Sequence, residues 1–230
     1  NAFERKEVQS ALPLQPQWDK PRAMVHAYDS GDTPEAKSYI SVNWMMPEST
    51  NVETTLALSI LSHILLATPA SPLKKALLDS GLGEDVLGGY QEDLRQGYFQ
   101  AGLKGVQRDD LEKVEKVIHE TLSGLVENGI DPETIAASLN TIEFRLREQN
   151  TGRFPRGLFM MLNALGPWLY DGDPFTGLAY EAPLNTLKAQ PKGYFERRIQ
   201  QPLIDNPHRA TVHLVPDPEE GQRRDEAERA

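Results

Sequence analysis

The sequence contains no cysteine among its 230 residues. Disulfide bonds and thiolate metal sites are therefore excluded. No apolar run approaches the ~20 residues that a membrane-spanning helix needs. Basic residues are also in the minority, with 24 Lys and Arg against 34 Asp and Glu, which gives a net charge of −10. Nucleic acids and anionic membranes bind clustered cations, so we expect neither as a partner.

Histidine is scarce as well. A helical zinc site uses two histidines four residues apart, because this spacing places both rings on one face. No pair has this spacing among the five histidines, which are His26, His63, His119, His208 and His213. The last two fall five residues apart near a predicted strand, which puts them on opposite faces. We predict no metal ligand and no cofactor-binding residue in this chain.

One short motif is compatible with nucleophilic catalysis. Ser71 and Lys74 form a Ser-x-x-Lys pattern, in which the lysine amine would take the proton of the serine hydroxyl. No Lys-Thr-Gly motif accompanies it. Ser71 also precedes Pro72, which is the pattern of a helix start with serine as N-cap and proline in the first position. We favour the helix start, and a Ser-x-x-Lys serine hydrolase is the alternative.

Three other clusters suggest binding sites but carry a simpler explanation. Gly81 and Gly83 follow a helix rather than a strand, so they indicate a helix end and not a phosphate loop. Asp171 and Asp173 lack the rest of a calcium loop. A basic cluster beside Glu143 and Glu148 is typical of an exposed helix face with ion pairs four residues apart, and its members are Arg145, Arg147, Arg153 and Arg156. We predict no catalytic residue.

Periodicity divides the chain into alternating strands and helices. We predict strands over Arg22–Tyr28, Ser38–Met46, Val86–Asp93, Gly97–Gly105 and Ala210–Val215. We predict helices from Thr50 or Asn51 to Pro69, Pro72–Asp79, Asp109–Gly129 with Asp109 and Glu112 as a capping box, from Asp131-Pro132 onward, Pro155–Tyr170, Ala182–Ala189 and Gly193–Leu203. This order indicates an α+β fold with a mostly antiparallel sheet and helices packed on one face.

The predicted helix over Pro155–Tyr170 is apolar on every side, which indicates either a buried helix or one packed against another domain. The two ends of the chain differ from its middle. Residues 1–19 are polar and interrupted by prolines, so we predict an extended arm or linker. Residues 20–215 form the predicted domain, and the charged residues 216–230 the predicted start of a helical linker.

Seven segments in order carry a resemblance to a known family. The longest is Ala67–Gly83, and the others are Tyr39–Trp44, Gly102–Val106, Ala137–Phe144, Glu148–Gly157, Trp168–Phe175 and Asn206–Val212. Together they span most of residues 36–218. The chain resembles presequence proteases, which are zinc metallopeptidases of the pitrilysin/insulinase family, and within them the second domain of the N-terminal half. The resemblance implies an α/β roll.

The resemblance also implies a role. In this family a His-x-x-Glu-His helix of the first domain holds zinc, which activates water for attack on a peptide bond. This chain has no such motif, so zinc is expected only in a full-length parent, and the chain is expected to be a non-catalytic chamber wall. The implied partners are the upstream zinc-bearing domain, the other parent domains and peptide substrate. The implied location is soluble: cytoplasm or periplasm in bacteria, an organelle matrix in eukaryotes.

A second hypothesis uses the same fold differently. The chain would then be a stand-alone assembly or interaction subunit without catalytic activity. An obligate subunit self-associates, whereas an excised domain can be a monomer, so the oligomeric state distinguishes the two hypotheses.

Overall fold

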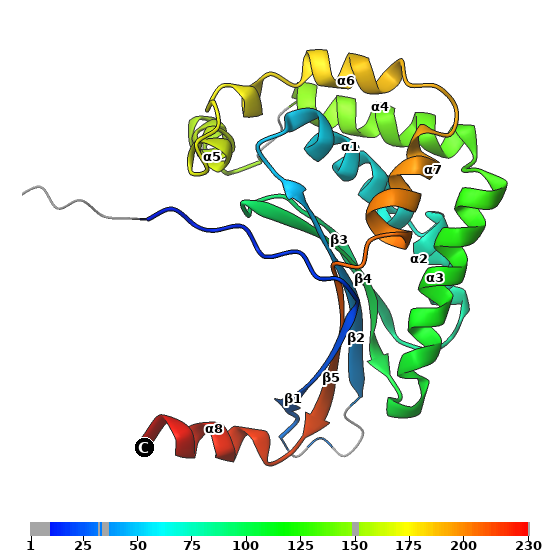
Figure 1. Ribbon diagram of the computed structural model, residues 1–230, viewed down its shortest axis with the longest axis vertical. Coiled ribbons are helices and arrows are strands. Elements are labelled where there is room, and N and C mark those ends of the chain that lie inside the picture. Colours follow the sequence, from blue (N-terminus) through cyan, green and yellow to red (C-terminus); the bar gives the residue numbers. More distant parts are fainter. Residues whose placement is uncertain (1–9, 32, 34–36, 149–151, 230) are drawn as a thin grey trace, which may run out of the picture.

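A computed structural model describes residues 10–31, 33, 37–148 and 152–229. A five-stranded sheet in the order β1-β5-β2-β4-β3 forms its centre (Figure 1). The strands are β1 (Arg22–Asp29), β2 (Ser38–Glu48), β3 (Asp85–Gln91), β4 (Gln96–Val106) and β5 (Arg209–Asp217). β1 pairs with β5 in parallel, and the other three pairings are antiparallel. The predicted α+β class is confirmed.

Except for the last helix, which projects from the other side, the helices lie on one side of this sheet, as predicted, and leave most of the opposite side open (Figure 1). The helices are α1 (Val52–Ser62), α2 (Pro72–Asp79), α3 (Leu111–Asn128), α4 (Pro132–Glu148), α5 (Arg156–Trp168), α6 (Glu181–Lys188), α7 (Tyr194–Ile199) and α8 (Glu220–Arg229). Four short turns complete the order: the π-helical η1 (His63–Ala67) and η4 (Gln200–Ile204), and the 3₁₀-helical η2 (Arg108–Asp110) and η3 (Thr176–Leu178).

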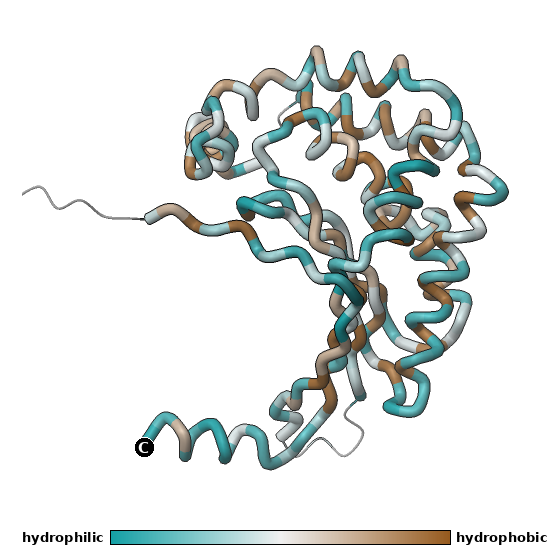
Figure 2. Tube along the Cα trace, in the orientation of Figure 1, coloured by the Kyte–Doolittle hydropathy of each residue, from teal (hydrophilic) through white to brown (hydrophobic). Residues whose placement is uncertain are grey.

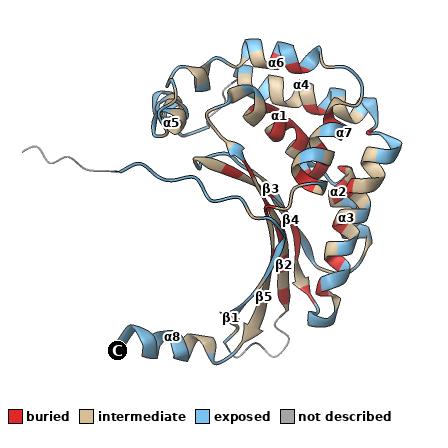
Figure 3. Ribbon diagram, in the orientation of Figure 1, coloured by how far each residue is buried: buried red, intermediate tan, exposed pale blue. Residues whose placement is uncertain are grey.

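The core lies between the sheet and the helix layer. Alternate residues of β2 point into it, and Ile40, Val42 and Trp44 have no exposed surface. The opposing α1 and η1 supply buried aliphatic residues between Leu56 and Leu66 (Figure 3). The stretch Val52–Asp79 is long and apolar enough to cross a membrane, but it is divided into α1, η1 and α2, and 61% of its most apolar window is buried in this core.

Helix boundaries follow local hydrogen bonding. The Asn51 side chain accepts a hydrogen bond from the Thr54 N–H at 2.9 Å, so Asn51, rather than Thr50, is the one of the two predicted candidates that caps α1. The predicted capping box at Asp109 is wrong, because η2 tightens the chain ahead of α3 and moves the N-cap to Asp110. The Asp110 carboxylate makes no cap bond and instead pairs with Lys113 at 2.6 Å.

Two predicted helices end in π turns that sequence periodicity did not indicate. The helix that begins after Asn51 continues through η1, and α7 passes into η4. In η4, the Asp205 N–H bonds the Gln200 carbonyl five residues back at 2.8 Å. Pro202 within this turn has no N–H, so the regular α-helical ladder is already interrupted there.

Helix α5 corrects one expectation. Of the two explanations for its all-round apolar character, burial within this chain is wrong, because no residue of α5 is buried. It packs chiefly on η3 and stands beyond the end of the sheet, where apolar residues reach the surface (Figures 1–3). The apolar pattern identified a helix that needs a partner, but not where that partner is.

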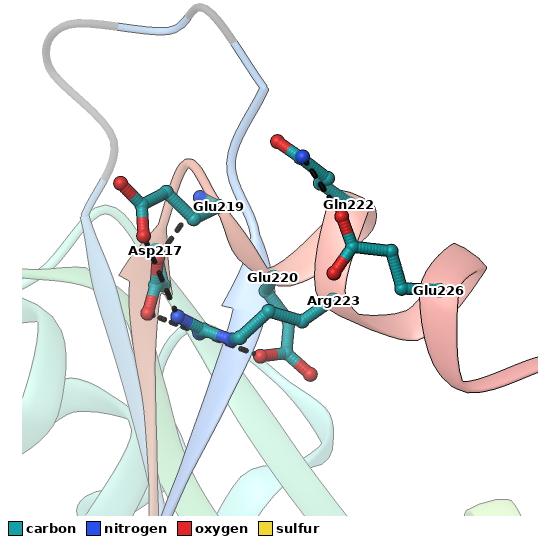
Figure 4. A network of polar contacts seen from close by, with 6 residues as sticks. All are labelled: Asp217, Glu219, Glu220, Gln222, Arg223 and Glu226. Atoms are coloured by element: carbon teal, nitrogen blue, oxygen red, sulfur yellow. Dashed lines mark hydrogen bonds and ion pairs between the residues drawn. The ribbon is translucent and has the colours of Figure 1, made fainter.

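The two ends of the described chain project from the open side of the sheet (Figure 1). Residues 1–9 of the predicted arm lie outside the described residues. Residues 10–19 form no helix or strand, and Trp18 contacts the His208 ring at 4.9 Å between centroids. At the other end, the Arg223 guanidinium bonds Asp217 at 2.5 Å and Glu220 at 2.8 Å, which fixes the first turn of α8 to the end of β5 (Figure 4).

Candidate functional site

The five histidines lie in different parts of the fold. His26 is exposed on β1, His63 lies in η1, and His119 lies on α3. His208 is buried just before β5, and His213 points to the helix side of that strand. In the part of the chain that the structure describes, no group of three or more His, Asp or Glu residues could hold a metal ion. The described residues therefore do not fit the zinc of the family, and no chemical step is assigned to zinc here.

Two of these histidines have altered proton affinity. Burial, aided by the charge of Arg145, lowers the pKa of His63, and the His63 Nδ1 lies 3.0 Å from the Ser138 hydroxyl. Burial, aided by Arg22, likewise lowers the pKa of His208. Both effects disfavour the charged imidazolium. The Ser138 hydroxyl beside His63 is buried, and among the described residues neither ring belongs to a group of metal-binding side chains, so we interpret both rings as packing groups.

A small polar cluster joins α3 to β5. Glu115 accepts a hydrogen bond from the Thr211 hydroxyl at 3.0 Å, and its carboxylate lies 3.8 Å from His119 Nε2. His119 and Thr211 together lower the pKa of Glu115 against the opposing effect of burial. His119 also meets the edge of the Trp44 ring. The cluster ties the outer helix layer to the sheet rather than forming a reactive centre.

Ser71 occupies the start of α2, as predicted, but its hydroxyl does not bond to the helix backbone. The hydroxyl lies 3.2 Å from the His63 carbonyl, to which it donates, and it accepts from the Thr68 N–H at 3.1 Å. Ser71 is buried, and its hydroxyl joins η1 to the loop before α2. The Lys104 ammonium, 2.9 Å from the exposed Asp85, is the main cause of the lowered pKa of that carboxyl, and the charge of Lys74 makes a smaller contribution to it. This is the geometry of a structural serine.

The remaining sequence candidates also have structural roles. Gly81 has φ +64 and follows the end of α2, as the helix-end interpretation predicts. Gly83 allows a close approach to β4, because a Cβ there would stand 2.9 Å from the Lys104 carbonyl oxygen. In the basic cluster, Arg147 pairs with Glu143 at 2.6 Å, four residues away. Asp173 accepts the Phe175 N–H at 2.9 Å and shapes the loop after α5.

The open face of the sheet is the surface most suited to a functional role. On β2 it carries Tyr39, Ser41, Asn43 and Met45, which alternate with the core residues and remain partly exposed. Asn43 donates to the Ser41 hydroxyl at 2.9 Å, so polar groups here are already organised. Such a mixed face can hold an extended peptide or a second protein surface without the dry packing of a core. The sequence pattern predicts which residues alternate, but not that helices leave this face uncovered.

A cavity of about 530 Å³ opens where the arm crosses the upper end of β2. It is lined by apolar side chains and carboxamides, and Arg198 from α7 is its charged side chain. Arg198 also lies over the Tyr194 ring at 5.2 Å. Sequence reasoning missed this cavity, because residues from the arm, β2, α1, β4, α7, η4 and the turn before β5 meet there only after folding.

Comparison with known proteins gives a consistent picture. A family described as "Peptidase M16 inactive domain" matches residues 5–142. The chain is 43% identical over 219 residues to Presequence protease 1, chloroplastic/mitochondrial, of Arabidopsis thaliana, covering 91% of this chain and 20% of that protein. It is 34% identical to the mitochondrial presequence protease of Mus musculus, covering 94% of this chain and 21% of that protein.

A solved structure shows the same fold. The chain aligns with a protease from Helicobacter pylori at a TM-score of 0.70 and 15% identity, over 93% of this chain and 49% of that one. At this identity the likeness concerns the fold alone. The chain spans about a fifth of the length of the two curated relatives.

Proposed function

The chain belongs to the peptidase M16 inactive-domain family, and from this membership we propose that it forms a non-catalytic chamber wall of a longer zinc-dependent endopeptidase. The observation that carries the proposal is the division of the fold into two sides. Helices cover one side of the sheet, and the other side is left open with a mixed polar and apolar surface (Figure 1). In this proposal the open face lines the space that receives the peptide.

The proposed activity belongs to the longer polypeptide. Its zinc, and the general base that activates water on it, would come from an upstream domain. The chain would contribute shape: a wall limits the chamber volume and thereby restricts substrates to short or unfolded peptides.

We further propose how the chain divides. Residues 1–19 would form an arm from the preceding domain, residues 20–215 the wall domain, and residues 216–230 the start of a helical linker. The extended backbone before Trp18 and the exposed helix α8 support these boundaries. The relatives named for mitochondria and chloroplasts favour an organelle matrix or a comparable soluble compartment.

Zinc stoichiometry tests the division of labour. The purified chain would be loaded with zinc, dialysed and analysed for bound metal. A value near zero supports a wall domain, since the zinc then belongs to other residues of the longer polypeptide. One tightly held zinc per chain would overturn the proposal, because some of the five histidines would then have to converge.

A second experiment tests the wall itself. In the longer polypeptide, Ser41→Trp would add bulk to the open face, and we expect it to reduce cleavage of long peptides more than of short ones. The control is Glu112→Trp on the exposed side of α3, which adds the same bulk outside the proposed chamber. Equal length profiles for both variants and the unsubstituted enzyme would place the open face outside the chamber.

A further inference from the structure

Helix α5 carries an apolar stripe that faces solvent. Five large side chains along one side of it are between 40% and 65% exposed, and these are Leu158, Met161, Leu162, Trp168 and Leu169. Counted from Leu158, the other four lie three, four, ten and eleven residues further on, which places all five on a single helical face; Leu169 is the C-cap that follows the last helical residue. Leu165 falls on the same face. We call these six residues the α5 stripe.

The α5 stripe differs from ordinary surface hydrophobic residues. Single exposed apolar side chains are common on soluble proteins, but a contiguous set marks a contact surface. Phe154, just before the helix, and Phe175, in the loop between α5 and η3, are also exposed at 43% and 73%. Inside the described chain, α5 rests mainly on the short turn η3, so most of its apolar surface has no cover there.

We propose that the α5 stripe is the seam by which this domain packs against an adjoining domain of the same longer polypeptide, an inference that rests on the proposed function. The identity of the partner follows from length. The chain spans about a fifth of two curated relatives and about half of the solved Helicobacter pylori protease chain, so matched domains of this kind are joined to further protein.

A permanently attached partner explains the stripe better than a transient one. A peptide substrate would leave six apolar residues in water whenever the chamber is empty, which favours aggregation. An adjoining domain keeps them covered, and its attachment through the chain gives a high effective concentration without a strong intrinsic affinity. The expected partner surface is apolar. Acidic groups at its edge would suit Arg153, which is exposed one residue before Phe154.

The lack of cysteine allows a direct test. A single cysteine would be introduced by Met161→Cys, and its reaction with a fluorescent maleimide would be followed in the 230-residue chain and in the longer polypeptide, with the label assigned by peptide mass spectrometry. We expect fast labelling in the chain and labelling slower by about 10-fold or more in the longer polypeptide, where the seam is closed. Leu162→Cys is the second reporter. The matched control is Lys116→Cys on the exposed side of α3, which should react equally in both.

Three results would overturn the proposal. Equal labelling of Met161→Cys in both proteins would show that the stripe stays open. Fast labelling in the longer polypeptide that slows only on addition of an unfolded substrate peptide would assign the stripe to substrate. A dimer of the 230-residue chain in light scattering that Met161→Glu dissociates would assign it to a second copy. Met161→Cys could react equally in both proteins while the Ser41→Trp variant still alters the preference for peptide length. In that case the α5 stripe is not an interdomain contact, but the proposed function stands.

Discussion

Gly102 on β4 lies so close to Ile40 on β2 that a Cβ atom at position 102 would stand 2.0 Å from the Ile40 carbonyl oxygen. The same atom would stand 2.8 Å from the Ser41 Cα. Both neighbours are backbone atoms, so no side-chain rotation relieves the contact. The approach occurs in the middle of the β2–β4 pairing, which joins the two halves of the sheet.

Replacing this glycine should therefore weaken the whole sheet. We expect Gly102→Ala to lower the free energy of unfolding by about 2–4 kcal/mol, because the strands must separate to accept one methyl group. Urea denaturation followed by circular dichroism measures the change. Gly157→Ala is the control, since no atom lies within 4 Å of its added Cβ. Its position inside α5 favours alanine by up to about 1 kcal/mol. Equal free energies of unfolding for Gly102→Ala and Gly157→Ala would contradict the close contact between β2 and β4.

Ser71 offers a test between structural and catalytic roles. Ser71→Ala removes the hydroxyl that bonds the His63 carbonyl and the Thr68 N–H, so we expect a loss of about 1–2 kcal/mol in unfolding free energy. Lys74→Ala should change stability by less than about 0.5 kcal/mol, as for most surface substitutions. A fluorophosphonate probe should leave Ser71 unlabelled in the unsubstituted chain. If the probe did label Ser71, and the Lys74→Ala substitution abolished this labelling, the serine hydrolase hypothesis would be supported instead.

Stability should fall as the solution is acidified below neutral pH. The folded pKa values of His63 and His208 lie below the value near 6.5 of an unfolded chain. The unfolded state therefore binds protons first as the pH drops, and the free energy of unfolding decreases through the window between the unfolded and folded pKa values. Chemical denaturation at a series of pH values from 7.5 downward measures this slope.

Substitutions assign the slope to these two rings. The double variant His63→Asn/His208→Asn should flatten the pH dependence, while His26→Asn on the exposed edge strand should leave it unchanged. A slope that persists in the double variant would place the responsible groups elsewhere. Glu115, whose pKa is lowered, contributes at lower pH, because its carboxylate stabilises the fold until the pH approaches its folded pKa.

The arm before β1 is held at Trp18. The Arg22 guanidinium lies 4.1 Å from the centre of the Trp18 ring, and His208 contacts the same ring. We expect Trp18→Ala to remove a contact worth about 0.5–1 kcal/mol and to speed proteolytic cleavage within residues 10–19. Mass spectrometry of a limited digest follows the cleavage. Trp168→Ala removes an exposed tryptophan from α5 and should leave the arm as resistant as before.

Residue patterns within the sequence predicted most of the helices and strands, because each pattern depends on one element only. The residue types of Ser38–Met46 predicted the strand β2, and Asn51 was one of the two predicted caps for α1. The π turn η1 escaped prediction, because one extra residue in a helical turn leaves no periodic trace in so short a segment. Asp109 was misplaced as a cap for a related reason: the 3₁₀ turn before α3 shifts the helix by one residue.

Features that depend on several elements could not be predicted in the same way. The apolar residues of α5 indicated a packed helix, but only the fold shows that Met161 and Trp168 face outward. The cavity beside Arg198 likewise depends on the crossing of the arm, β2 and η4. The resemblance predicted the family, which the match to the peptidase M16 inactive domain confirms, because it rests on several motifs in order rather than on single reactive side chains.

The parallel pairing of β1 with β5 has a mechanical consequence. The chain enters the sheet at Arg22, leaves it at Asp217, and joins these adjacent strands by eight aligned residue pairs. Because the strands run in the same direction, tension between the flanking segments pulls them from opposite ends. Their hydrogen bonds are then loaded together in shear, rather than opened one after another. Force applied between the segments before Arg22 and after Asp217 would therefore pass along this single strand pair, while the helix layer lies outside the line of load.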